Sequence, residues 1–314
     1  MQFSVVICTY NRSRILVNVL KTLVEQVVPE DFQLEILVVD NNSTDDTPRV
    51  VERFAQQSDF LVRYVKEKKQ GLSHARNRGI LEAQGKYIAF TDDDALADEF
   101  WVREIYNTFE EYHCHCVGGK IHLRCEIEMP LWLQKELWGF LGYFDHGDKV
   151  ISIDHESNYP FGGNMAFLKD VFKEIGYFNP NLGRRGTISF GGEEAELFGR
   201  LFQAGGTAIY QPGALVYHVI QIERMKKRYF RKLHFNEGRI KGQEMMDYDG
   251  RIFLGVPLFI FPQFLRSIRD YIYSICTNGL NKSFRTEMNI WYFQGLMLER
   301  IKNYYRNTKS RIMN

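Results

Sequence analysis

Strand-like and helix-like segments alternate through the first 97 residues. Four short segments are apolar and rich in β-branched or aromatic residues, as buried strands are: Phe3–Thr9, Leu34–Val39, Leu61–Val65 and Lys86–Thr91. Apolar residues at helical spacing lie between these segments, as they do from Ile15 to Val27. The alternation predicts right-handed βαβ units, and therefore an α/β domain with a mainly parallel, Rossmann-like sheet and flanking helices.

Polar residues stand where these strands end. Thr9-Tyr10-Asn11 follows the first strand, Asp40 the second, and the three consecutive carboxylates Asp92–Asp94 the fourth. The carboxyl ends of parallel strands meet at one edge of a sheet, so we expect these groups around one crevice. Adjacent carboxylates repel unless a cation or hydrogen-bond donors compensate, and Mg²⁺ or Mn²⁺ favours carboxylate and phosphate oxygens. The alternative is an acidic turn that caps a helix near Asp98.

The usual phosphate-binding motifs are missing. No Gly-x-Gly-x-x-Gly follows the first strand, and the chain has no Gly-x-x-x-x-Gly-Lys-Ser/Thr. Phosphates would have to be held in another way, and a metal ion on the aspartate cluster would serve.

Four motifs resemble glycosyltransferase family 2 in order and spacing. They are Val-Val-Ile-Cys-Thr-Tyr-Asn-Arg, Ile-Leu-Val-Val-Asp-Asn-Asn-Ser-Thr-Asp, Gly-Leu-Ser-His-Ala-Arg-Asn-Arg-Gly and Ile-Ala-Phe-Thr-Asp-Asp-Asp. The resemblance covers about residues 3–218. It implies the GT-A fold and an inverting, metal-dependent enzyme that uses a nucleoside-diphosphate sugar.

The resemblance also implies roles for single residues. Asp40 would bond the base, Asp92 would lie near the ribose or sugar, Asp94 would bind Mn²⁺ or Mg²⁺, and Asp93 would lie between them. The other residues implied on the nucleotide side are Thr9, Tyr10, Asn11, Arg12, Arg76 and Asn77. From the residues alone, Asp40 could equally be a helix-capping turn residue, and Arg76 could belong to a solvated helix face.

The acceptor side draws on later segments. Tyr159–Phe167, which includes Gly163 and Asn164, resembles the family's glycine-rich acceptor segment. The aromatic residues Trp132 and Trp138 either stack on sugar rings or belong to the core. Arg185 lies in a polar loop that either closes over the diphosphate or is a plain surface loop.

Two acidic residues and one histidine complete the expected site. Glu193 and Glu194 open an amphipathic helix, where the helix dipole alone favours acidic residues. The family carries a Glu-Asp pair there, whose Asp is the catalytic base. Glu194 takes that position here and is longer than Asp by one methylene, so either Glu193 or Glu194 would reach the acceptor hydroxyl, and we expect Glu194 to be the base. His218 ends the last strand and would complete the metal shell, although a lone histidine is often structural.

The composition of the chain limits the classes of partner and the cellular compartment that we expect for it. The chain has 314 residues and a formal net charge of +1, which argues against a nucleic-acid-wrapping protein. Five cysteines, an odd number, and no basic leader favour a reducing, cytoplasmic compartment. Cys114 and Cys116 lack the usual zinc spacing and instead suit one face of a strand.

The C-terminal third differs in character. We expect a catalytic domain at 1–220, with a nucleotide half at 1–112 and an acceptor half at 113–220, and a helical, amphipathic extension at 221–314. Its basic helix and the apolar Ile252–Leu265 favour a segment lying on the inner face of the cell membrane. That apolar segment could instead be a hairpin buried on the catalytic domain or on a second subunit of a homo-oligomer.

Together these features predict an inverting hexosyltransferase that uses a UDP-sugar. Its acceptor would be a glycan or lipid-linked saccharide in the synthesis of a cell-surface polysaccharide. The alternatives are a non-catalytic sugar- or nucleotide-binding relative, which would not need the acidic base, and a sugar nucleotidyltransferase, which would need a glycine-rich loop after the first strand.

Overall fold

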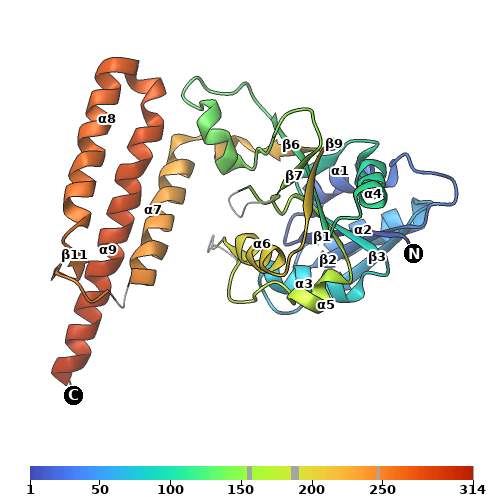
Figure 1. Ribbon diagram of the computed structural model, residues 1–314, viewed down its shortest axis with the longest axis horizontal. Coiled ribbons are helices and arrows are strands. Elements are labelled where there is room, and N and C mark those ends of the chain that lie inside the picture. The colour runs from blue at the N-terminus through green and yellow to red at the C-terminus, as the bar shows by residue number, and fades with distance from the viewer. Residues whose placement is uncertain (154–157, 185–190, 246–247, 314) are drawn as a thin grey trace. The chain divides into compact units, whose positions relative to one another are not determined.

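The described residues divide into two compact units. The first holds Met1–Arg124 and Gly142–Val219, and the second holds Cys125–Leu141 and the chain from Ile220 onward. The sequence favoured placing Cys125–Leu141 in the acceptor half, whereas its contacts group it with the C-terminal helices. The computed structural model (Figure 1) describes residues 1–153, 158–184, 191–245 and 248–313.

The first unit is built on a mixed sheet, and the expected GT-A class of α/β fold is confirmed. In the described residues the sheet has nine strands in the order β3-β2-β1-β4-β8-β6-β9-β5, with β7 beside β9. Their bounds are β1 Phe3–Thr9, β2 Leu34–Asp40, β3 Leu61–Lys66, β4 Tyr87–Asp92, β5 Ala95–Ala97, β6 Cys116–Cys125, β7 Ile151–Ile153, β8 Asn164–Leu168 and β9 Ala208–Ile220.

The first four strands are parallel, as predicted. All seven residues of β2 are buried, as expected for a strand covered on both faces. Helices α1 and α2 carry the chain one way across the sheet and α3 carries it back, so right-handed crossovers put α3 on the opposite side. In Figure 1, α1 and α4 lie on one side of the sheet, and α3 and α6 on the other. The helices of this unit are α1 Ser13–Val24, α2 Thr47–Gln57, α3 Leu72–Glu82, α4 Trp101–Tyr112, α5 Val171–Ile175 and α6 Glu193–Gln203.

The other half of the sheet is antiparallel. Strand β8 pairs with both β4 and β6, and β9 pairs with β5 and β7. Thr9 lies opposite Asp40 and Cys8 opposite Asp92, which brings the ends of β1, β2 and β4 to one edge. Ala95 lies opposite His218, so β9 reaches the residues that follow β4. Cys116 begins β6, whereas Cys114 precedes that strand, so the prediction that both lie on one strand is wrong for Cys114; both side chains are buried and unbridged.

The second unit is helical, as expected for the C-terminal region. Helix α9 lies between α7 and α8 (Figure 1). The glycines Gly238 and Gly242 let α7 approach α9, because a Cβ there would overlap the α9 backbone. Trp132 packs its ring on Phe230 and Phe284 in this unit. The elements are η1 Lys135–Leu141, η2 Ile222–Met225, α7 Lys227–Glu244, β10 Ile252–Phe253, β11 Val256–Pro257, α8 Ile260–Lys282 and α9 Phe284–Met313.

Among the described residues, no helix has the length and apolar character needed to cross a membrane.

Candidate functional site

The carboxylates that follow β4 are engaged by the loop that follows β1. Arg12 Nη1 lies 2.7 Å from Asp93 Oδ1 and 2.9 Å from Asp94 Oδ2. The Thr9 hydroxyl donates to Asp93 Oδ2 at 2.8 Å. Burial raises the pKa of Asp93 to about 6, although Arg12 and Thr9 oppose the rise. Sequence segments more than 80 residues apart thus meet at the predicted edge.

Asp94 and His218 form a donor pair of one oxygen and one nitrogen. Asp94 Oδ1 lies 3.1 Å from His218 Nε2. Neighbouring ligands of an octahedral ion with bonds of about 2.1 Å are about 3.0 Å apart, so the spacing fits a shared Mg²⁺ or Mn²⁺. Within the described ranges, no group of three or more His, Cys, Asp or Glu residues could hold a metal. An ion on this pair would therefore need other ligands, and phosphate oxygens and water suit it.

A second cluster joins α3 to α6. Buried Arg76 donates through Nη1 to Glu193 Oε1 at 3.1 Å and through Nη2 to Glu194 Oε1 at 3.0 Å. Its guanidinium also lies over the Phe178 ring, 5.3 Å from the centroid. We call Arg76, Glu193 and Glu194 the Arg76 cluster. The contacts confine both carboxylates although they are 117 and 118 residues from Arg76 in the chain.

The two carboxylates of the Arg76 cluster differ in environment. The Glu193 side chain is 4% exposed, and its Oε2 is buried without a hydrogen-bond partner among the residues that the structure describes. The Glu194 side chain is 22% exposed. Burial raises the pKa of Glu194; Arg76 opposes the rise, and the charges of Glu193 and Asp92 add to it. Glu194 is thus the more accessible carboxylate, and it holds its proton more tightly than an ordinary glutamate.

Gly162 is required by the Arg76 cluster. A Cβ at this position would collide with Arg76 Nη2 and Glu194 Oε1. Its neighbour Gly163 lies beside Asp92, where a Cβ would stand 3.0 Å from Oδ2. The glycine-rich segment therefore lies between Asp92 and the Arg76 cluster.

Asp40 is satisfied by the protein itself. It is fully buried, its Oδ1 accepts the Ser43 backbone N–H at 2.8 Å, and its Oδ2 accepts the Tyr64 hydroxyl at 2.7 Å. Asp40 is thus a turn residue, as the alternative interpretation held, but it caps no described helix, because α2 begins at Thr47 after Asp46. A bond to a base stays a prediction, and it would need one of these partners to move.

The loop after β1 is also braced internally. Asn11 has a φ of 52°, and its Oδ1 accepts the Thr44 backbone N–H at 2.8 Å. Tyr10 beside it is exposed. The loop therefore presents an aromatic ring from a fixed backbone, and its contact with a base stays a prediction.

Two predicted asparagines bond to the backbone of the protein. Asn77 exchanges hydrogen bonds with the Phe178 backbone, at 2.8 Å through Nδ2 and 2.9 Å through Oδ1. Asn164 is fully buried and donates to the Lys120 and Ala214 carbonyls. Both amides hold segments of the first unit together, while their ligand contacts remain predictions.

Three further predicted residues are two tryptophans and Arg185. Trp132 and Trp138 are in the second unit, and Trp138 donates its indole N–H to the Leu133 carbonyl at 3.1 Å. Stacking of either ring on a sugar is untested. Arg185 falls outside the described residues.

Sequence reasoning missed a polar network beside His218. Gly142 approaches the His218 ring, and a Cβ at that glycine would lie 2.9 Å from Nδ1. Farther along this loop, Asp145 accepts the Tyr143 hydroxyl at 2.9 Å and the Gly147 N–H at 2.8 Å. These bonds hold the pKa of Asp145 below its usual value although burial opposes that shift. The network fixes the loop beside the donor pair, and no motif in the sequence signals it.

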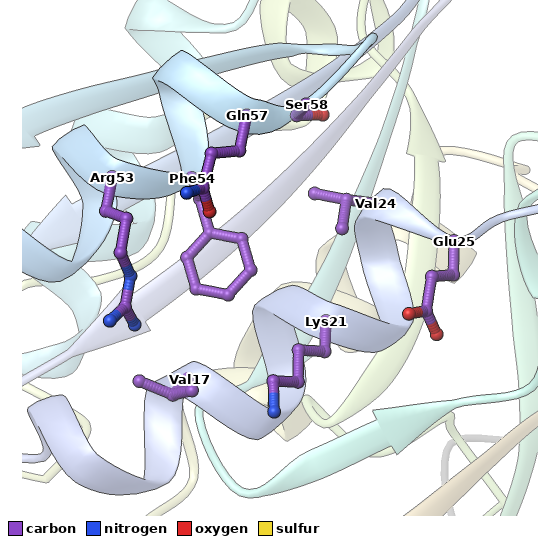
Figure 2. Close-up of a pocket in the computed structure, with 8 residues that line it drawn as sticks. All are labelled: Val17, Lys21, Val24, Glu25, Arg53, Phe54, Gln57 and Ser58. Carbon is purple, nitrogen blue, oxygen red and sulfur yellow. The ribbon is translucent and has the colours of Figure 1, made fainter.

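A pocket of about 570 Å³ lies between α1 and α2 (Figure 2). Phe54 points from α2 toward α1, and Lys21, Glu25 and Arg53 lie around it. The pocket contains none of the predicted site residues.

Comparison with known proteins gives consistent matches. Residues 4–176 match the family model described as glycosyl transferase family 2. The chain is 28% identical over 221 residues to a glucosyl-dolichyl phosphate glucuronosyltransferase of Haloferax volcanii, covering 69% of each. It is 26% identical over 238 residues to the succinoglycan biosynthesis protein ExoM of Rhizobium meliloti, covering 76% of this chain and 73% of that protein.

A solved structure shares the fold. The mannosyltransferase PcManGT from Pyrobaculum calidifontis, in complex with GDP-Man and Mn²⁺, superimposes with a TM-score of 0.58 at 18% identity. The match covers 96% of this chain and 87% of that one.

Proposed function

Because the chain belongs to glycosyl transferase family 2, we propose that it transfers a sugar from a nucleoside-diphosphate sugar to an acceptor hydroxyl. The preferred donor is a UDP-sugar, and the transfer inverts the configuration of the anomeric carbon. One observation carries the proposal. In the donor pair, Asp94 follows β4 and His218 lies on β9, and the Arg76 cluster couples electrostatically to Asp92 at the end of β4. These two features support a diphosphate-binding site and a proton acceptor around the end of β4.

The donor pair fits a divalent ion. Asp94 and His218 would hold Mn²⁺ or Mg²⁺, which when bound supplies positive charge against the departing diphosphate. Arg12 already faces Asp93 and Asp94 at hydrogen-bond distance, so it adds charge at the same place. The complex of the mannosyltransferase PcManGT, a protein of the same fold, with GDP-Man and Mn²⁺ supports this use of a metal.

Glu194 is the proposed base. It removes the proton from the acceptor hydroxyl as the new glycosidic bond forms, and Arg76 orients it for that step. Attack from the side opposite the diphosphate inverts the anomeric carbon, through an oxocarbenium-like transition state. The raised pKa of Glu194 suits this role, because a base whose pKa lies closer to the working pH accepts a proton more readily.

The nucleotide half would hold the rest of the donor. Thr9, Tyr10, Asn11 and Arg12 follow β1, and Asp40 ends the neighbouring strand, so we place the base and ribose there. Arg76, Asn77, Asp92 and Asp93 complete this side of the proposal, together with Arg185 outside the described residues.

The proposed acceptor is a glycan or a lipid-linked saccharide. The names of two relatives, a glucosyl-dolichyl phosphate glucuronosyltransferase and a succinoglycan biosynthesis protein, support these acceptor classes. Gly163, Asn164, Trp132 and Trp138 stay the proposed acceptor-side residues. We place the protein at the cytoplasmic face of a membrane, where lipid-linked acceptors are available, and leave self-association as a property to measure.

Release of nucleoside diphosphate from a panel of UDP-, GDP- and dTDP-sugars tests the proposal. One donor should be consumed only with Mn²⁺ or Mg²⁺, and Glu194→Gln should abolish consumption while donor binding persists. Glu196→Gln is the matched control, since Glu196 lies on the same helix and pairs with Arg200. Equal loss of donor binding in Glu194→Gln would remove the base assignment.

A further inference from the structure

Helix α8 buries Ile260 at its start but exposes several large apolar side chains farther along. The residues it buries include the small, polar Ser267 and Ser274. Leu265 is 65% exposed and Tyr273 is 70% exposed, and Ile272 and Leu280 are exposed as well. At 3.6 residues per turn Leu265, Ile272 and Tyr273 lie opposite the two serines, whereas Leu280 follows a kink at Gly279. A surface helix of a water-soluble protein shows the reverse pattern.

The hairpin that precedes α8 in the chain adds further exposed apolar residues. Ile252, Phe253 and Leu254 follow one another at its tip and are all exposed, and Leu258 and Phe259 are exposed where it leads into the helix. Single exposed apolar residues are ordinary, whereas a contiguous set marks an interaction site. We call the outer face the set Ile252, Phe253, Leu254, Leu258, Phe259, Leu265, Ile272, Tyr273 and Leu280.

Positive charge accompanies the outer face. Arg266 and Arg269 are exposed among its residues on α8. From residue 220 to the end the chain carries 18 Lys and Arg against 8 Asp and Glu, a formal net charge of +10, while residues 1–219 carry −9. Tyr304 and Tyr305, also exposed, lie near the hairpin, since Gly255 approaches the Tyr304 side chain. Tyrosine is enriched where membranes meet water.

We propose that the outer face docks on an anionic lipid bilayer. Apolar side chains that enter the headgroup layer and basic residues that attract anionic lipids are the two signals that together give stable attachment. A second copy of the chain is the poorer occupant, because two C-terminal segments from residue 220 onward, each of formal charge +10, repel each other. The inference names the surface through which the protein would contact the membrane, and its biological meaning rests on the proposed function. The vesicle experiment below does not depend on that function.

Vesicle flotation of the full chain, without donor or acceptor, tests the inference. The protein should float with vesicles containing phosphatidylglycerol, bind phosphatidylcholine vesicles weakly, and dissociate as the salt concentration rises. The double variant Leu265→Gln/Ile272→Gln should lower the lipid partition coefficient by about tenfold or more. Leu81→Gln is the matched control, because Leu81 is an equally exposed leucine of α3 in the first unit.

Several outcomes would overturn the inference. These are no flotation with anionic vesicles, flotation that the double variant retains, or self-association in sedimentation equilibrium that the double variant abolishes without any vesicle binding. Circular dichroism of each variant shows whether it folds. If the double variant does not fold, Arg266→Gln/Arg269→Gln repeats the test on exposed charges, with weaker binding to anionic vesicles expected. Loss of transfer activity with intact flotation would count against the proposed function alone.

Discussion

Arg76 should be essential for stability because it neutralises one buried and one half-buried carboxylate. Its Nη atoms lie 3.1 and 3.0 Å from Glu193 and Glu194. With charge centres about 4 Å apart and an effective dielectric constant of about 20, each pair interacts by about 4 kcal/mol. Desolvation offsets part of this, and removing one partner of a buried pair costs about 3–5 kcal/mol. Arg76→Met should therefore lower the free energy of unfolding by about 3–5 kcal/mol near pH 8.

The loss should shrink as the pH falls. Without Arg76, the mutual repulsion of Glu193 and Glu194 and the charge of Asp92 raise further the pKa of Glu194, which burial already raises. A carboxyl group whose pKa is raised in the folded state stabilises the fold at pH values below its pKa in the unfolded state. This stabilisation is lost as the pH rises through the pKa of the folded state. The variant should thus be closest to wild type under acidic conditions.

Urea unfolding followed by circular dichroism at about pH 5.5 and about pH 8 measures this effect. Arg78→Met is the matched control on α3, because Arg78 is exposed and its pair with Glu82 should contribute no more than about 1 kcal/mol. Adding Glu193→Gln and Glu194→Gln to Arg76→Met should recover most of the stability. An equal loss at both pH values, or no recovery in the triple variant, would refute the reasoning.

Three further predictions concern the site and the helical unit. The transfer rate should fall as the pH drops through the raised pKa of Glu194, since the base must be deprotonated, and a pH–rate profile without an acidic limb would exclude the role. Gly162→Ala should disrupt the Arg76 cluster and reduce transfer by about tenfold or more, whereas Gly191→Ala, with open space around its Cβ, should match wild type in the same assay. Gly238→Ala should destabilise the packing of α7 on α9 by about 1–3 kcal/mol in urea unfolding. Gly139→Ala in the same unit should not, because no described atom lies near the position of its Cβ. Equal stability of the two variants would contradict the close packing of α7 on α9.

Local pattern was enough to predict the sheet. The apolar segments Phe3–Thr9 and Leu34–Val39 are strands β1 and β2 within a residue, because strands buried on both faces leave a continuous apolar signal. The rule that parallel strands end at one edge then correctly brought Asp40 and Asp92–Asp94 to the same side of the sheet. The antiparallel half was harder, since β8 and β6 pair through register that no local pattern encodes.

The polar contacts of the site were beyond sequence reasoning. Arg76 was expected on the nucleotide side or on a solvated face, yet it is buried and holds two glutamates 117 and 118 residues away. The amide of Asn164 likewise bonds carbonyls 44 and 50 residues away. Such contacts depend on tertiary geometry, which helical periodicity does not contain. Cys125–Leu141 illustrates the same limit, since its grouping with the C-terminal helices follows from packing.

Thermal unfolding with UDP, GDP, dTDP or CMP, each with and without Mn²⁺, tests the central claim most directly. A ligand at about 100 times its dissociation constant that binds only the folded state adds about 2.7 kcal/mol of stability. One nucleoside diphosphate should raise the melting temperature of the wild type only with Mn²⁺. Asp94→Asn should lose this shift, whereas the control variant Asp46→Asn should keep it, because the Asp46 side chain is exposed. No shift with any nucleotide, or an unchanged shift in Asp94→Asn, would contradict a metal-dependent donor site at this edge of the sheet.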